Sequence, residues 1–134
     1  MRFELSAVPT AQQRTRHTKT GRAYKSAAQE ANERTLEALL LPYKPKMPLR
    51  GPVRLDFTAC MPIPASVSKR RREAMLSGKI GHTVKPDVDN LAKQLLDAMT
   101  RMGFWEDDRQ VVELAGRKRY DATPRWLVEV RGDG

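Results

Sequence analysis

The chain has one cysteine, two histidines and no long apolar run, and each of these scarcities excludes a class of protein. A single cysteine, Cys60, excludes an internal disulfide and any metal site built from several cysteines. With only His17 and His82 to assist it, a zinc or copper centre is disfavoured, so we expect any metal site to use oxygen ligands. No run could cross a bilayer, and the start, MRFELSAVPT, lacks a signal-peptide core. We therefore expect a cytoplasmic protein without a membrane partner.

Aromatic residues are also few, at 6%, whereas positive charge is abundant and unevenly distributed. The formal net charge is +9 over 134 residues. Residues 1–86 carry 17 Lys and Arg against 6 Asp and Glu, while residues 87–134 carry 8 against 10. The basic excess favours a polyanionic partner, and nucleic acid before a membrane, because no basic amphipathic helix with an aromatic apolar face is present.

The pattern of apolar residues and chain breakers predicts one small α/β (α+β) domain over residues 1–134, with a mixed four-stranded sheet and flanking helices. Alternation predicts strands at 2–8 and 53–61, and a closing hairpin of 110–120 and 125–131 with "DATP" as its turn. Helices are expected at 24–41 and 90–102, and a short basic helix or ordered loop ends at Gly78. Gly103 is the expected C-terminal cap of the helix at 90–102.

Six carboxylates gather in residues 85–108 of this basic chain. Asp87 and Asp89 lie two residues apart in a segment expected to be extended, so both can face one point in space. Asp107 and Asp108 follow the helix at 90–102, and one of them could return to the first pair if the chain doubles back. Convergent carboxylates raise each other's pKa unless a cation lies among them, and hard oxygen ligands suit Mg²⁺ or Mn²⁺.

Lys93 lies four residues after Asp89 and four before Asp97, so all three share one helical face. Beside a metal, the lysine would stabilise negative charge that develops on a phosphodiester. Alternatively, the three residues form a surface ion-pair ladder. The aspartates before the helix could likewise be caps, and "EDD" could be a solvated turn. Spacing alone leaves both alternatives open.

The stretch "KPDVDNLAKQLLDAM" followed by "GFWEDDRQV" resembles the central motif of the RusA family of Holliday junction resolvases of phages and prophages. A first strand, a basic "GRAY" segment, a proline-rich break and a closing hairpin occur in the same order, so the resemblance covers most of the chain. It implies a homodimeric, Mg²⁺-dependent endodeoxyribonuclease of mixed α/β fold, with Mn²⁺ as an alternative metal and no small-molecule cofactor. Such an enzyme resolves four-way branched DNA by paired symmetric nicks during recombination and repair, in the cytoplasm of a bacterial or phage-infected cell.

The resemblance also implies the site residues. The metal ligands and catalytic acids would be Asp87, Asp89 and Asp108, and the essential lysine would be Lys93. Asp107 then lies outside the ligand set, and Asp97 is either a salt-bridge partner or a minor contributor.

Clustered bases are the candidate DNA contacts, because they bind phosphates without reading sequence. They are Arg14, Arg16, Lys19, Arg22, Lys69, Arg70, Arg71, Arg72 and Lys85. Pro86 stands where some relatives carry a basic residue, and Lys85 could substitute for it. Phe104 and Trp105 are expected to plug the core after the helix rather than stack on DNA.

Two other classes of protein fit the same composition. One is a non-catalytic basic DNA- or RNA-binding protein in which the acids serve as caps and ion pairs. The other is a basic, ribosome-associated or interaction protein that prefers RNA. Cleavage of a junction in the presence of Mg²⁺ or Mn²⁺ separates the first from the nuclease, and competition between junction DNA and structured RNA at matched salt tests the second.

Overall fold

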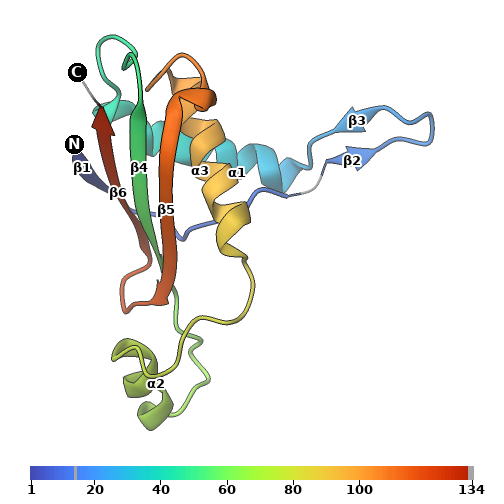
Figure 1. Cartoon of the computed structure of the whole chain (residues 1–134). Coiled ribbons are helices and arrows are strands. Elements are labelled where there is room, and N and C mark those ends of the chain that lie inside the picture. The colour runs from blue at the N-terminus through green and yellow to red at the C-terminus, as the bar shows by residue number, and fades with distance from the viewer. Residues whose placement is uncertain (14, 133–134) are drawn as a thin grey trace.

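The computed structural model describes residues 1–13 and 15–132 (Figure 1). Arg14, one of the predicted DNA contacts, lies outside the described residues. Within them, no helix has both the length and the apolar character needed to cross a membrane. The elements in chain order are β1 Arg2–Leu5, β2 Arg16–His17, β3 Ala23–Tyr24, α1 Ala27–Leu40, the 3₁₀ helix η1 Leu41–Tyr43, β4 Val53–Met61, α2 Lys69–Leu76, α3 Val88–Met102, the 3₁₀ helix η2 Asp108–Gln110, β5 Val111–Tyr120 and β6 Arg125–Gly132.

The main sheet has the strand order β1-β6-β4-β5, which confirms the predicted mixed sheet of four strands. β5 runs parallel to β4, whereas β6 runs antiparallel to β4 on its other side and to β1. The predicted pairing of β5 with β6 is wrong, because β4 lies between them. The turn after β5 crosses the end of β4, where the Asp121 N–H donates to the Met61 carbonyl at 3.0 Å. A strand as apolar as β4 is favoured at the centre of a sheet. The crossing places β5 on one side of β4 and β6 on the other.

Helices α1 and α3 cover one face of the sheet, and the core lies between them and the strands (Figure 1). The predicted stripe of α3 is confirmed, since Leu91, Leu95, Ala98 and Met99 are fully buried. Gly103 ends α3 with a left-handed φ of 83°, as predicted.

The residues that follow α3 agree with the prediction, whereas α1 starts later than predicted. Phe104 and Trp105 are buried and complete the core, as expected. α1 begins at Ala27, later than predicted, because the Ser26 hydroxyl caps it by accepting the Gln29 N–H at 3.1 Å.

The basic segment after β1, expected to be a loop, contains a short antiparallel ribbon of β2 and β3 that projects from the body of the molecule (Figure 1). The Thr18 N–H donates to the Arg22 carbonyl at 2.8 Å, and Gly21 turns the chain with a φ of 85°. We call residues 15–25 the arm. Its sequence resembles a loop because each strand has only two residues and both are exposed.

Gly116 of β5 is required by packing, because a Cβ there would lie 2.5 Å from the Phe57 ring. We predict that Gly116→Ala lowers the free energy of unfolding by about 1–3 kcal/mol, since the buried ring would have to move. Chemical denaturation measures this change. Gly81→Ala is the matched control, because a Cβ there meets nothing within 4 Å, and it should shift stability by no more than about 0.5 kcal/mol. Equal effects of the two variants would contradict this account.

Candidate metal and nucleic-acid site

Two predicted acids lie at the N-terminal end of α3. Asp87 occupies the N-cap position with an extended backbone, but its side chain makes no capping hydrogen bond. Asp89 lies in the first helical turn, which corrects the expectation that both residues belong to an extended segment. Both side chains are exposed, at the positive end of the helix dipole. The helix end therefore reduces the repulsion between the two carboxylates without using either one as a cap.

The predicted ion-pair ladder along α3 is not formed. Among residues 1–13 and 15–132, the structure pairs Lys93 with neither Asp89 nor Asp97. The ion pairs of α3 come instead from Arg101, which contacts Glu37 at 2.7 Å and Glu33 at 3.8 Å on α1. The Lys93 ammonium is exposed and remains available to a ligand.

The adjacent acids Asp107 and Asp108 have different environments. The Asp107 carboxylate caps η2 by accepting the Arg109 N–H at 2.9 Å, and this bond holds the pKa of Asp107 below its ordinary value. The Gln110 side chain returns to accept the Asp107 N–H at 3.1 Å and completes a capping box. Asp108 is exposed and, in the part of the chain that the structure describes, pairs with no cation. Asp107 is therefore engaged in local structure, while Asp108 keeps its carboxylate accessible.

A single chain does not bring Asp108 to the acid pair. α3 has 15 residues, so at a rise of 1.5 Å per residue its two ends lie about 20 Å apart. Asp108 opens η2, which follows the C-terminal end of α3, and β5 then runs back along the helix (Figure 1). Within the described residues, no group of three or more His, Cys, Asp or Glu could hold a metal ion. The expected doubling back of "EDD" onto Asp87 and Asp89 does not occur within one chain.

Lys118 of β5 anchors the segment that leads into α3. Its ammonium donates to the Val84 carbonyl at 2.7 Å and to the Pro86 carbonyl at 2.9 Å, on either side of the cis Lys85–Pro86 peptide bond. Asp87 follows directly. Sequence reasoning missed Lys118. Its alternation with Gly116 nevertheless placed a lysine on the helix-covered side of a strand.

His82 and Tyr120 hold the same segment from the other end. Their ring centroids lie 4.8 Å apart, and both side chains are buried. Burial, and secondarily the charge of Lys118, lower the pKa of His82, so its imidazole is favoured in the neutral form. The end of β5 thus fixes residues 82–86 by one ring contact and two hydrogen bonds.

We predict that Lys118→Met speeds amide hydrogen exchange in residues 82–89, because the two carbonyl contacts are lost while the aliphatic stem is retained. Lys118→Arg should stay closer to the wild type, since a guanidinium can donate to both carbonyls. Exchange in β4, measured in the same experiment, should change little. Unchanged exchange in residues 82–89 of Lys118→Met would mean that Lys118 does not hold this segment.

A buried polar network fixes the root of the arm against α3. Gln29 of α1 donates to Gln94 of α3 at 2.9 Å, and the Gln29 side chain also accepts the Gln13 N–H at 2.9 Å. The Gln12 N–H donates to the carbonyl of Asn90 at 3.2 Å, one residue after Asp89. The basic arm therefore begins beside the acidic end of α3, a relationship that no local pattern in the sequence indicated.

The predicted DNA contacts share one property within the described residues, since none of them forms an ion pair with a carboxylate. Those on the arm are Arg16, Lys19 and Arg22; those on α2 are Lys69, Arg70, Arg71 and Arg72; Lys85 precedes α3. All are exposed. α2 lies beyond the ends of β4 and β5 nearest the start of α3 (Figure 1). Unpaired cations are therefore present on the arm, whose root lies beside the acidic end of α3, and on α2 beyond the neighbouring ends of β4 and β5.

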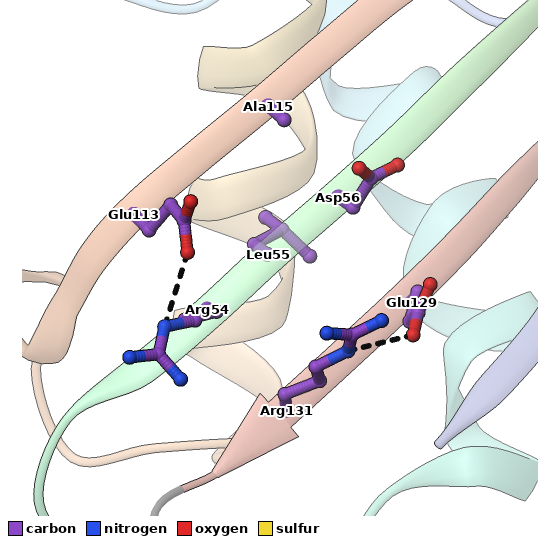
Figure 2. A pocket seen from close by; sticks show the side chains of 7 residues that line it. All are labelled: Arg54, Leu55, Asp56, Glu113, Ala115, Glu129 and Arg131. Atoms are coloured by element: carbon purple, nitrogen blue, oxygen red, sulfur yellow. Dashed lines mark hydrogen bonds and ion pairs between the residues drawn. The ribbon is translucent and has the colours of Figure 1, made fainter.

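Cations on the open face of the sheet are paired instead. Figure 2 shows a hollow on this face, lined by residues of β4, β5 and β6, with α3 behind the strands. Arg54 contacts Glu113 at 3.0 Å, and Arg131 contacts Glu129 at 2.8 Å. None of the predicted site residues lines this hollow. Phosphate binding is thus expected at the arm and α2 rather than on the open sheet.

The family model described as endodeoxyribonuclease RusA matches residues 4–131. The chain belongs to this family. A crossover junction endodeoxyribonuclease rusA of Lactococcus phage r1t is 31% identical over 131 residues, which are 96% of this chain and 93% of the phage protein. The RusA relatives are named endodeoxyribonucleases, and this supports a nuclease enzyme. Membership in the RusA family also suggests a divalent metal cofactor in general.

Two further relatives match part of their length. The Uncharacterized protein YqaN of Bacillus subtilis (strain 168) is 38% identical over 91 residues, 66% of this chain and 63% of YqaN. The crossover junction endodeoxyribonuclease RusA of Escherichia coli (strain K12) is 32% identical over 98 residues, 73% of this chain and 65% of that protein. These two matches span slightly less than two thirds of each relative.

Proposed function

We propose that this RusA-family chain, acting as one domain over residues 1–134, is a metal-dependent endodeoxyribonuclease that resolves four-way DNA junctions by paired symmetric nicks. The observation that carries the proposal is the arrangement of unpaired charges. Accessible carboxylates lie at the start of α3 beside the root of the basic arm, and α2 carries further unpaired bases beyond the nearby strand ends. The names of the phage and bacterial relatives support junction DNA as the substrate class.

The donor set fits a hard divalent cation, Mg²⁺ or alternatively Mn²⁺. Asp87 and Asp89 offer carboxylate oxygens that no cation of the described chain neutralises, and Asp108 offers a third carboxylate. A bound divalent ion would supply charge neutralisation at the scissile phosphate and activation of water. Asp107 is left out of this set because its carboxylate caps η2.

We assign Lys93 a role in binding the phosphate rather than a role in stabilising the fold. It lies one helical turn after Asp89, on the same face of α3, and forms no ion pair with Asp89 or Asp97. An ammonium held there can donate hydrogen bonds to a phosphate oxygen on which negative charge develops in the transition state. Its role is thus electrostatic stabilisation.

A homodimer would complete the site. The length of α3 separates Asp108 from Asp87 and Asp89 by about 20 Å, so all three can meet only if Asp108 comes from a second copy. A two-fold dimer then has two such sites, one at each end, as paired nicks on opposed strands require. The proposed dimer therefore serves both metal binding and the symmetry of cutting.

The bases of the arm and of α2, with Lys85, would bind the phosphate backbone on either side of the cut. Such contacts carry no sequence information and weaken steeply as salt rises. Junction selectivity on this view comes from the shape of branched DNA, whose separate helices would present phosphates to the arm and to α2.

The test is cleavage of a synthetic four-way junction by the purified chain with Mg²⁺, Mn²⁺ or EDTA, beside a linear duplex of the same sequence and a structured RNA at matched salt. We expect metal-dependent nicks at symmetric positions of the junction and little cleavage of the duplex or RNA. Tight junction binding without cleavage under any metal would instead favour a non-catalytic DNA-binding protein. Preference for the RNA would favour the RNA-binding alternative.

A further inference from the structure

The N-terminal end of α3 leaves a strong helix cap unused. Asp87 occupies the N-cap position with an extended backbone, where an aspartate ordinarily accepts a hydrogen bond from an N–H of the first turn. The Asp87 side chain makes no such bond, although the hydroxyls of Ser26 and Ser68 cap α1 and α2 in this way. The carboxylate is therefore held off the helix end, and contacts elsewhere fix the path by which the chain enters α3.

Two residues at the end of β5 supply those contacts. Lys118 and Tyr120 lie two positions apart in the strand, so their side chains point to the same side of the sheet. The Tyr120 ring packs on His82, with ring centroids 4.8 Å apart. The Lys118 ammonium donates to the Val84 carbonyl at 2.7 Å and to the Pro86 carbonyl at 2.9 Å. Every second residue of segment 82–86 is thus held by β5, and the last contact falls one residue before the N-cap of α3.

Lys118 uses its charge on backbone groups. Its side chain is half-buried, and in the part of the chain that the structure describes it pairs with no carboxylate. Removing an ammonium from water costs free energy unless its N–H groups find acceptors, and two of its three donors are bound to carbonyls of one short segment. The ordered lysine therefore fixes a backbone path, and that path leads directly to Asp87.

We propose that Lys118 is a positioning residue for the metal site: by bonding two carbonyls of segment 82–86, it keeps the Asp87 carboxylate off the helix cap and available, together with Asp89, to a divalent ion. The inference rests on the proposed function only for the nature of the ligand, a hard divalent cation. Lys118 acts through Asp87 and need not touch the ion. Groups that orient metal ligands in this way change metal affinity by about 10–100-fold when they are removed.

A positioning role and a purely electrostatic role for Lys118 have opposite consequences. A positive charge near two carboxylates opposes the binding of a cation to them, so loss of the charge alone would tighten cation binding. Loss of the two carbonyl contacts instead frees the entry to α3 and lets the Asp87 carboxylate turn to the vacant helix cap, which weakens cation binding. The direction of the change in affinity therefore identifies the role.

The first test measures Mn²⁺ binding to the full chain by isothermal titration calorimetry at fixed salt and without DNA. Lys118→Met keeps an unbranched stem but removes the donors, and it should weaken Mn²⁺ binding by about tenfold or more. Lys118→Arg, whose guanidinium can donate to both carbonyls, should recover most of the affinity. Thermal unfolding of each variant, followed by circular dichroism, reports whether the fold as a whole is retained.

Arg119→Met is the matched control. It removes one positive charge from the next residue of β5, whose side chain points to the opposite side of the sheet and makes only a 3.9 Å contact with Asp121. Its Mn²⁺ affinity should equal or exceed that of the wild type. Unchanged or tighter binding by Lys118→Met, or equal weakening in Arg119→Met, would overturn the proposal. A Lys118→Met chain that fails to fold would also overturn it, because Lys118 would then support the whole fold.

A second test uses the wild type without any substitution. If Lys118 holds the entry to α3 before an ion binds, saturating Mn²⁺ should leave amide hydrogen exchange nearly unchanged in residues 82–86 and at Leu91, whose N–H donates to the Asp87 carbonyl at 3.1 Å. In Lys118→Met, exchange at these amides should be faster without Mn²⁺ and should slow toward the wild-type rate when the ion is added. Strong slowing by Mn²⁺ in the wild type would mean that the ion itself orders the segment, and would reject the proposal.

Cleavage of a four-way junction separates this inference from the proposed function. A wild type that binds Mn²⁺ and loses affinity in Lys118→Met, yet cuts no junction, would retain the positioning role and reject the nuclease. A wild type that cuts junctions while Lys118→Met binds Mn²⁺ normally would retain the nuclease and reject the positioning role. A wild type that neither binds Mn²⁺ nor cuts junctions would reject both.

Discussion

Asp89→Asn is expected to reduce cleavage of a four-way junction by about 10³-fold or more, while junction binding stays at least as tight as in the wild type. The substitution keeps the size and shape of the side chain but removes one of the charges that would hold the metal. Because Asp89 is exposed and makes no ion pair with the residues that the structure describes, the fold should lose little more than the favourable interaction with the helix dipole, about 0.3–1 kcal/mol. Single-turnover cleavage and an equilibrium binding assay in EDTA measure the two quantities.

Asp97→Asn is the matched control for this prediction. It removes the same charge from the same helix, two turns further along and on the same face, and Asp97 likewise makes no ion pair in the described chain. Cleavage by this variant should stay within about tenfold of the wild type, as expected of a residue that only contributes to the local field. Equal losses in the two variants would show that general charge on α3, rather than a ligand at Asp89, supports activity.

Local patterns predicted those parts of the structure that depend on near neighbours. Strand 53–61 has the predicted bounds, since alternation of apolar residues reports directly which side of a strand is buried. The apolar stripe of α3 follows from helical periodicity, and its terminal glycine from the left-handed conformation of a helix C-terminal cap. Asp87 and Asp89 were predicted to lie together before the helix, and they do lie at its start, although Asp89 belongs to its first turn.

Features that depend on contacts between distant segments could not be predicted in this way. A turn between two strands predicts a hairpin, but the pairing of β6 with β4 is decided by competition for the apolar strand at the centre of the sheet. The buried Gln29–Gln94 hydrogen bond joins two residues that are 65 positions apart on different helices, and neither glutamine alone indicates its partner. The separation of Asp108 from the acid pair follows from the path of residues 103–107, which do not fold back along α3, and the spacing in sequence carries no sign of that path.

That separation yields a second prediction of large effect. Asp89→Asn and Asp108→Asn homodimers should each be inactive on junctions, whereas a mixture of the two chains should regain nicking. In a mixed dimer, Asp89 of one chain and Asp108 of the other are both intact at one site and both substituted at the other. With free exchange of subunits, half of the dimers are mixed and each has one intact site, so the nicking rate should reach about a quarter of the wild-type rate.

The alternative in which each chain builds its own site predicts no recovery, because every chain in the mixture then carries a defect in its own site. A mixture of Asp89→Asn with Asp87→Asn is the negative control for recovery on mixing, since both substitutions fall at the same end of α3 and no combination of these chains yields an intact site. Restored nicks should moreover occur in one strand at a time, because a mixed dimer has a single working site. Recovery in the Asp89–Asp108 mixture together with silence in the control would assign Asp108 to the partner's site, and silence in both would reject a site shared between two chains.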